Sequence, residues 1–157
     1  MKPASLSTLK KELALLTPND MIAICMKLIK FKKENKELLG YLLFDANDEP
    51  GYIISVKAEI DSQFTEINLG HLYFAKKSIR KILKNTNKYI KYSGLKQTEV
   101  ELLIHFCTKM KALGKPIKSS NTLSNLYENQ LRKIRLAIGK LHEDLQHDYL
   151  EEIKRLV

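Results

Sequence analysis

Residues 71–92 read HLYFAKKSIRKILKNTNKYIKY, and this stretch gives the clearest indication of the fold class. Its apolar residues recur every three or four positions, which is the period of an amphipathic α-helix and not of a β-strand. Ser93 and Gly94 follow it, and glycine is a common residue at the end of a helix. The stretch therefore predicts one long helix over residues 71–92.

The basic residues of this predicted helix share one side. At about 100° per residue they fall within an arc of about 140°, opposite the apolar side chains. They are Lys76, Lys77, Arg80, Lys81, Lys84, Lys88 and Lys91. No acidic residue occurs from Ile67 to Thr98. Like charges three or four residues apart repel each other by about 0.2–0.5 kcal/mol per pair, so folding alone does not require this arrangement.

Two interpretations of these seven basic residues are open. They form a surface that binds an anion or nucleic acid, or they pack near the chain's own acidic segments, residues 59–66 or 143–152. Few aromatic residues lie near them, namely Tyr73, Phe74 and Tyr92. If nucleic acid binds here, we therefore expect contacts to its backbone and not a reading of its base sequence.

The same helical period continues on both sides of this stretch. Residues 37–44 are apolar on nearly all sides, which predicts a buried helix. Thr98 precedes Glu101 by three residues, the spacing of a capping box that would begin the next helix. The last pattern starts at Ser119 or Ser120 and runs to Leu156, and it predicts one very long helix, or two with a break near Gly139 or His142.

Turn-forming residues are scarce, with only six glycines and four prolines in 157 residues. A many-stranded β fold needs a turn every eight to twelve residues or so, which this composition does not favour. We predict an all-α fold of six to eight antiparallel helices. They form either a short right-handed stack like those of armadillo and HEAT proteins, at the level of architecture only, or a compact helical bundle.

The length predicts a single all-helical domain over residues 1–157. A short internal sequence similarity suggests two copies of a three-helix unit, residues 18–67 and 71–141. In each copy a short pattern, LIKF at 28–31 or YIKY at 89–92, is followed by the letters ELL. Chance is the alternative, because leucine and lysine are common in helices.

No pattern of catalytic or metal-ligating residues emerges. Cys25 and Cys107 form no CxxC pair. His142 and His147 are five residues apart, about 140° around a helix, whereas a zinc-binding pair needs a spacing of four. His105 and Cys107 point to opposite sides of a helix. We therefore expect no enzyme activity, no catalytic residue, no metal, no cofactor and no small-molecule substrate.

The net charge is 27 − 18 = +9, which favours anionic partners. Neither a signal peptide nor an apolar run near 18 residues is present, so we expect a cytoplasmic protein and no membrane contact. Helical stacks usually bind proteins. The sequence thus predicts a non-enzymatic helical binding or scaffold module whose partner is another protein. The alternative is a non-specific nucleic-acid-binding protein that uses the basic side of residues 71–92.

Overall fold

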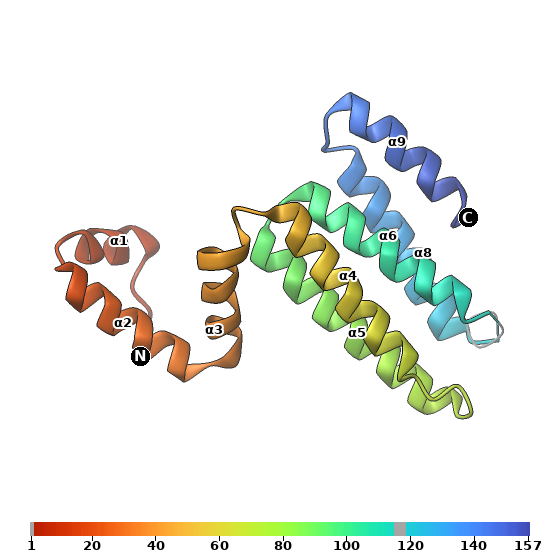
Figure 1. Cartoon of the computed structure of the whole chain (residues 1–157), viewed down its shortest axis with the longest axis horizontal. Helices are drawn as coiled ribbons and strands as arrows, with labels where there is room; N and C mark the ends of the chain where they lie inside the picture. The colour runs from red at the N-terminus through yellow and green to blue at the C-terminus, as the bar shows by residue number, and fades with distance from the viewer. Residues whose placement is uncertain (1, 115–118) are drawn as a thin grey trace. The chain divides into compact units, whose positions relative to one another are not determined.

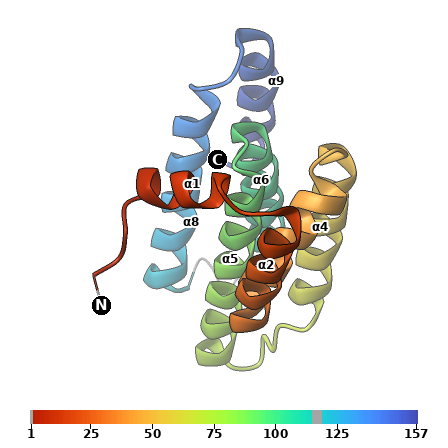
Figure 2. The ribbon, with the colours of Figure 1, turned by 90° about the vertical axis from the view of Figure 1, so that its left-hand side faces the viewer.

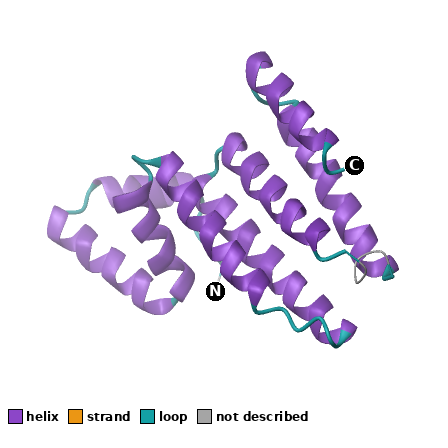
Figure 3. Ribbon diagram, turned by 45° about the vertical axis from the view of Figure 1, so that its right-hand side comes forward, coloured by secondary structure: helices purple, strands orange, loops and turns teal. Residues whose placement is uncertain are grey.

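The structure is a computed structural model that describes residues 2–114 and 119–157. Within these residues it contains eight α-helices, one π-helical turn and no strand (Figures 1 and 3). The predicted all-α class is therefore confirmed. The chain divides into two compact units, an N-terminal unit Met1–Phe44 and a C-terminal unit Asp45–Val157. The single domain over residues 1–157 and the repeat of residues 18–67 in 71–141 stay predictions.

The N-terminal unit holds three helices, and none of them contains a fully buried residue. They are α1 (Leu6–Ala14), α2 (Pro18–Phe31) and α3 (Lys33–Gly40). The side chains of Ser5 and Thr17 cap α1 and α2, because each accepts a hydrogen bond from a backbone N–H in the first turn. Helices α2 and α3 pack against each other.

The prediction of one buried helix over residues 37–44 is wrong. The α-helix ends at Gly40, and the π-helical turn η1 (Tyr41–Asp45) follows it. Leu42, Leu43 and Phe44 are 54%, 60% and 79% exposed. A helix that is apolar on every side is buried only where neighbours cover every side. In this unit α2 is the one helix that packs extensively on α3.

The C-terminal unit holds five described helices. They are α4 (Glu49–Thr65), α5 (Leu72–Ser93), α6 (Lys96–Ala112), α8 (Asn121–Ile138) and α9 (Glu143–Lys154). Helix α6 lies at the centre, in contact with α4, α5 and α8, and α9 packs on α8. The axes of α4, α5, α6 and α8 are nearly parallel, and consecutive helices run in opposite directions (Figures 1 and 2). An armadillo- or HEAT-like stack stays a prediction.

The core of this unit is built around α6, because neighbouring helices cover it on several sides. Its most deeply buried apolar side chains, each no more than 1% exposed, are Val100, Leu102, Leu103, Phe106, Cys107 and Met110. The ring of Phe106 meets that of Phe64 on α4 edge to face, with 5.6 Å between centroids. Helix α6 is thus buried in the way that the sequence pattern had suggested for residues 37–44.

Two predicted helix boundaries have different outcomes. Helix α6 begins at Lys96, and Thr98 caps nothing, because its buried hydroxyl donates a hydrogen bond to Glu49. The capping-box prediction is therefore wrong. The break near Gly139 or His142 is confirmed: α8 ends just before Gly139, and His142 is the N-cap of α9.

Candidate nucleic-acid interface

Helix α5 has one side fixed to the core of its unit. Its buried residues are Ala75, Ile79, Ile82 and Thr86, and the helix packs against α4 and α6. The hydroxyl of Thr86 donates a hydrogen bond to the carbonyl oxygen of Ile82 at 2.9 Å, so it is buried with its bonding satisfied. Gly94 ends the helix with a left-handed φ of 70°, a conformation that glycine adopts without steric cost.

The seven basic residues, called the basic face from here on, lie on the other side of α5. Five are exposed, and Lys76 and Lys88 are half-buried. Within residues 2–114 and 119–157, six of the seven form no ion pair with any carboxylate; they are Lys76, Lys77, Arg80, Lys81, Lys84 and Lys91. The structure therefore places the predicted residues together on one outward side of one helix.

Lys88 differs from the other six because it contacts aromatic rings. Its Nζ lies 5.0 Å from the ring centroid of Tyr89 and 6.0 Å from that of Tyr92. A cation this close to an aromatic ring is attracted by the ring quadrupole. This contact holds the side chain of Lys88 against the helix surface.

The chain's own acidic segments do not pair with the basic face. Lys81 lines a polar pocket of about 470 Å³ together with Glu59 and Glu66 of α4, but neither carboxylate forms an ion pair with it. Glu59 instead accepts a hydrogen bond from Gln63 at 2.6 Å. The second acidic segment, residues 143–152, lies wholly on α9, which packs on α8. The positive charge of the six residues other than Lys88 is therefore not neutralised by ion pairs among the described residues.

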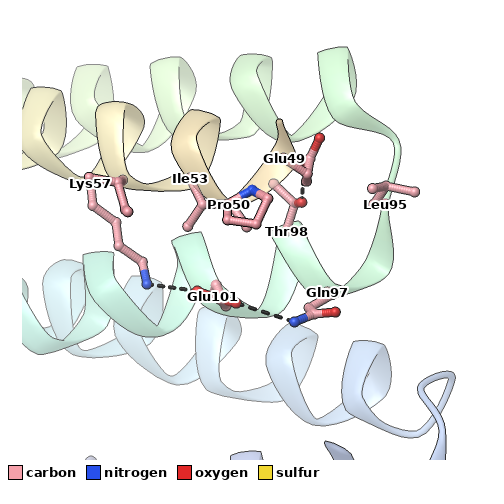
Figure 4. A pocket seen from close by; sticks show the side chains of 9 residues that line it. Glu49, Pro50, Ile53, Lys57, Leu95, Gln97, Thr98 and Glu101 are labelled. Atoms are coloured by element: carbon pink, nitrogen blue, oxygen red, sulfur yellow. Dashed lines mark hydrogen bonds and ion pairs between the residues drawn. The ribbon is translucent and has the colours of Figure 1, made fainter. Parts of the chain in front are cut away.

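A second polar cluster lies between α4 and α6, in a pocket of about 390 Å³ (Figure 4). The Nζ of Lys57 is 2.8 Å from one carboxylate oxygen of Glu101. The other oxygen accepts hydrogen bonds from the hydroxyl of Tyr149 at 3.0 Å and the amide of Gln97 at 3.4 Å. Both oxygens of Glu101 are thus occupied by partners from three helices, and we interpret the cluster as a structural network.

The charge state of Glu101 follows from these partners. Burial is the largest single influence and by itself would raise the pKa of the carboxyl. The hydrogen bond and charge of Lys57, with the hydrogen bonds from Tyr149 and Gln97, outweigh it and leave the pKa lowered. Burial and the neighbouring carboxylate also raise the pKa of Tyr149 to about 12. Glu101 is therefore ionised and Tyr149 is a neutral donor at neutral pH.

A third cluster joins α4 to α6 through Asp61. One oxygen of its carboxylate lies 2.6 Å from Nε2 of His105 and 3.0 Å from Nζ of Lys109. Burial would raise the pKa of Asp61, but these two partners outweigh it and lower the pKa. His105 is thus engaged with a carboxylate and not with Cys107. Burial, helped by the charge of Glu128, raises the pKa of Cys107 to about 12, so this thiol is not a reactive thiolate.

Sequence reasoning missed both of these carboxylate clusters. Glu101 lies 44 residues from Lys57 and 48 from Tyr149, and Asp61 lies 44 from His105. Local spacing carries no signal for such pairs, because only the packing of α4, α6 and α9 brings them together. The basic face was found because all of its members belong to one helix.

In the part of the chain that the structure describes, no group of three or more His, Cys, Asp or Glu side chains is placed to hold a metal ion. The same residues include no helix that is both long and apolar enough to cross a membrane. Comparison of the chain with protein-family models, with curated proteins and with solved structures found no match.

Proposed function

We propose that this chain is a non-enzymatic helical binding module that binds the phosphate backbone of nucleic acid through the basic face of α5. The observation that carries the proposal is the set of six basic side chains that have no ion-pair partner among the described residues. Their mutual repulsion costs free energy in the free protein, and a row of phosphates would relieve it.

The geometry of the basic face suits a phosphate backbone. At 1.5 Å per residue it extends about 23 Å along the helix axis from Lys76 to Lys91. A backbone lying along it would meet several cations at once and release its condensed counterions. With about four such contacts, the affinity for duplex DNA should fall with salt at a log–log slope near −3.6. Six of the seven side chains are lysines, which bind phosphate as point charges and carry no base specificity.

The test is a double charge reversal, Arg80→Glu with Lys84→Glu. Both side chains are exposed, and glutamate is a good helix former, so the fold should be kept. Binding is measured by fluorescence anisotropy with a labelled 20-base-pair duplex, first at low salt, where it is strongest. Near physiological salt the Kd of the wild type should be on the order of 10⁻⁴ to 10⁻⁶ M. The variant should lose this binding.

The matched control is Arg132→Glu with Lys133→Glu, which reverses one arginine and one lysine on the exposed side of α8. It takes the net charge from +9 to 9 − 4 = +5, as the first variant does. If both variants lose binding equally, the interaction depends on the net charge of the protein and not on the basic face of α5. Binding that is unchanged in the α5 variant would place the surface elsewhere.

A second candidate function, binding of another protein, is favoured by the N-terminal unit. Large apolar side chains are exposed along its helices, for example Ile22 at 61% and Phe31 at 85%. An apolar pocket of about 320 Å³ lies between α2 and α3, and it is lined by Cys25, Leu28, Ile29, Asn35, Leu38, Leu39 and Leu42. A groove of this composition suits the apolar side of a partner's amphipathic helix.

This candidate is tested with a photo-crosslinking residue introduced at Phe31 in the full chain. Irradiation of cells that express the protein should give discrete protein adducts at this position. The control is the same residue at Asp144 on α9, whose side chain is 92% exposed but lies in a polar segment. Adducts that are equal at both positions, or absent at Phe31, would contradict a partner for the N-terminal unit.

A further inference from the structure

We propose that the α5 surface prefers single-stranded nucleic acid, because two exposed aromatic rings at its N-terminal end can stack on unpaired bases. This inference rests on the proposed function, and it adds the class of ligand. The rings belong to Tyr73 and Phe74, in the first turn of α5. The surface would recognise an unpaired base through the aromatic rings and the phosphate that follows it through the basic residues.

Both rings are open to solvent although they are large and apolar. Tyr73 is 72% exposed and Phe74 is 52% exposed. They contact each other edge to face, with 5.5 Å between centroids and 75° between planes. His71 meets Phe74 in the same way, at 5.9 Å and 88°. Edge-to-face contacts support the rings without covering all of their faces, so a flat base can still stack on them.

The rings continue the basic face and are not a separate patch. Tyr73 precedes Lys76, Lys77 and Arg80 by three, four and seven residues, which puts them on the same side of the helix. Phe74 stands in the same relation to Lys77 and Lys81. From Tyr73 to Lys91 the combined surface extends about 27 Å. A strand that stacks one base at the N-terminal end can therefore lay its phosphates along the lysines that follow.

A duplex cannot use these rings without disruption, because its bases are already stacked on one another. A single strand exposes its bases, and aromatic side chains beside a positively charged groove are the general means of binding it. Removing one stacking ring from such a site typically weakens binding by about five-fold to 150-fold per base. Stacking adds no charge, so the salt dependence should not change when the rings are removed.

The experiment compares four probes of matched length over the same series of salt concentrations. They are a thymidine 20-mer, a uridine 20-mer, a 20-base-pair duplex and an abasic strand that carries the same number of phosphates as the thymidine 20-mer. The variant is Tyr73→Ala with Phe74→Ala in the full chain, and Tyr73→Phe is its conservative partner. Thermal unfolding of each variant checks that the helical fold is kept.

We expect the wild type to bind the thymidine strand at least five-fold more tightly than the abasic strand. The double alanine variant should lose this preference and bind both strands alike, with an unchanged salt slope, and Tyr73→Phe should keep the preference. Comparison of the uridine and thymidine strands shows whether the protein prefers RNA or DNA. Any preference for the uridine strand over the abasic strand must also be lost in the double alanine variant.

Two further outcomes separate this inference from the proposed function. Equal wild-type affinity for all four probes, abolished by Arg80→Glu with Lys84→Glu, would overturn stacking and leave backbone binding in place. A preference for thymidine that survives the double alanine variant would also overturn it, since the bases would then be read elsewhere. No binding of any probe at low salt would end both proposals.

Discussion

Replacement of Glu101 by glutamine tests the network that joins α4, α6 and α9. The change removes the negative charge but keeps the volume of the side chain and one oxygen that can accept from Tyr149. Hydrogen bonds to charged groups contribute about 1.5–3 kcal/mol, and fully exposed pairs contribute about 0.2–1 kcal/mol. The side chains of Lys57 and Glu101 are 31% and 23% exposed, between these limits. We therefore expect Glu101→Gln to lower the free energy of unfolding by about 1–2 kcal/mol at pH 7.

The pH dependence gives this prediction a second, independent readout. The pKa of Glu101 is lowered in the folded protein from its ordinary value of 4.5. A carboxyl with a lowered folded pKa stabilises the fold above the unfolded pKa, and the contribution is lost as the pH falls through the folded pKa. The difference between wild type and Glu101→Gln should therefore be largest at neutral pH and should shrink below pH 4.5.

Urea unfolding followed by far-UV circular dichroism at pH 7 and below pH 4 measures both effects. Glu99→Gln is the control, because among the described residues Glu99 pairs only with Lys96, three residues away on the same helix, and such pairs within one helix contribute about 0.2–0.5 kcal/mol. Equal stability of wild type and Glu101→Gln at pH 7, or a difference that widens on acidification, would show that the ionised Glu101 does not stabilise the fold.

Three other predictions concern the C-terminal unit. Phe106→Ala should lower the free energy of unfolding by about 3–5 kcal/mol, measured by urea unfolding, and Phe106→Leu should cost clearly less. In the native protein at pH 8, a thiol reagent should modify Cys25 well before Cys107, and both should react after unfolding, because burial holds the pKa of Cys107 near 12. Gly94→Ala should cost about 1–2 kcal/mol, because φ is +70° there, whereas Gly40→Ala should not destabilise; thermal unfolding compares them.

The success of the sequence analysis at α5 and its failure at residues 37–44 have one physical origin. The period of α5 and the side on which each lysine lies depend on local geometry, which 100° steps describe. Burial of an apolar helix depends instead on which other helices surround it. Residues 37–44 and α6 both carry dense apolar patterns, but only α6 is enclosed by α4, α5 and α8.

The candidate site divides in the same way. Its seven basic residues could be predicted because one helix carries all of them, and because the opposite side of that helix is apolar. Whether acidic segments cover these residues depends on how the helices pack. The sequence alone therefore allowed two interpretations of the basic residues. The structure places Glu59 and Glu66 beside Lys81 without an ion pair, and no spacing rule contains that information.

The absence of fully buried residues from α1, α2 and α3 has a consequence for local stability. Helices of 8 to 14 residues are marginal in water when they bury few apolar side chains, so their amide hydrogens should exchange with solvent through frequent local opening. Amides of α6 should exchange only in global unfolding. If a partner covers the N-terminal helices as proposed, part of its binding free energy would go into suppressing that opening, which lowers the affinity for the area buried.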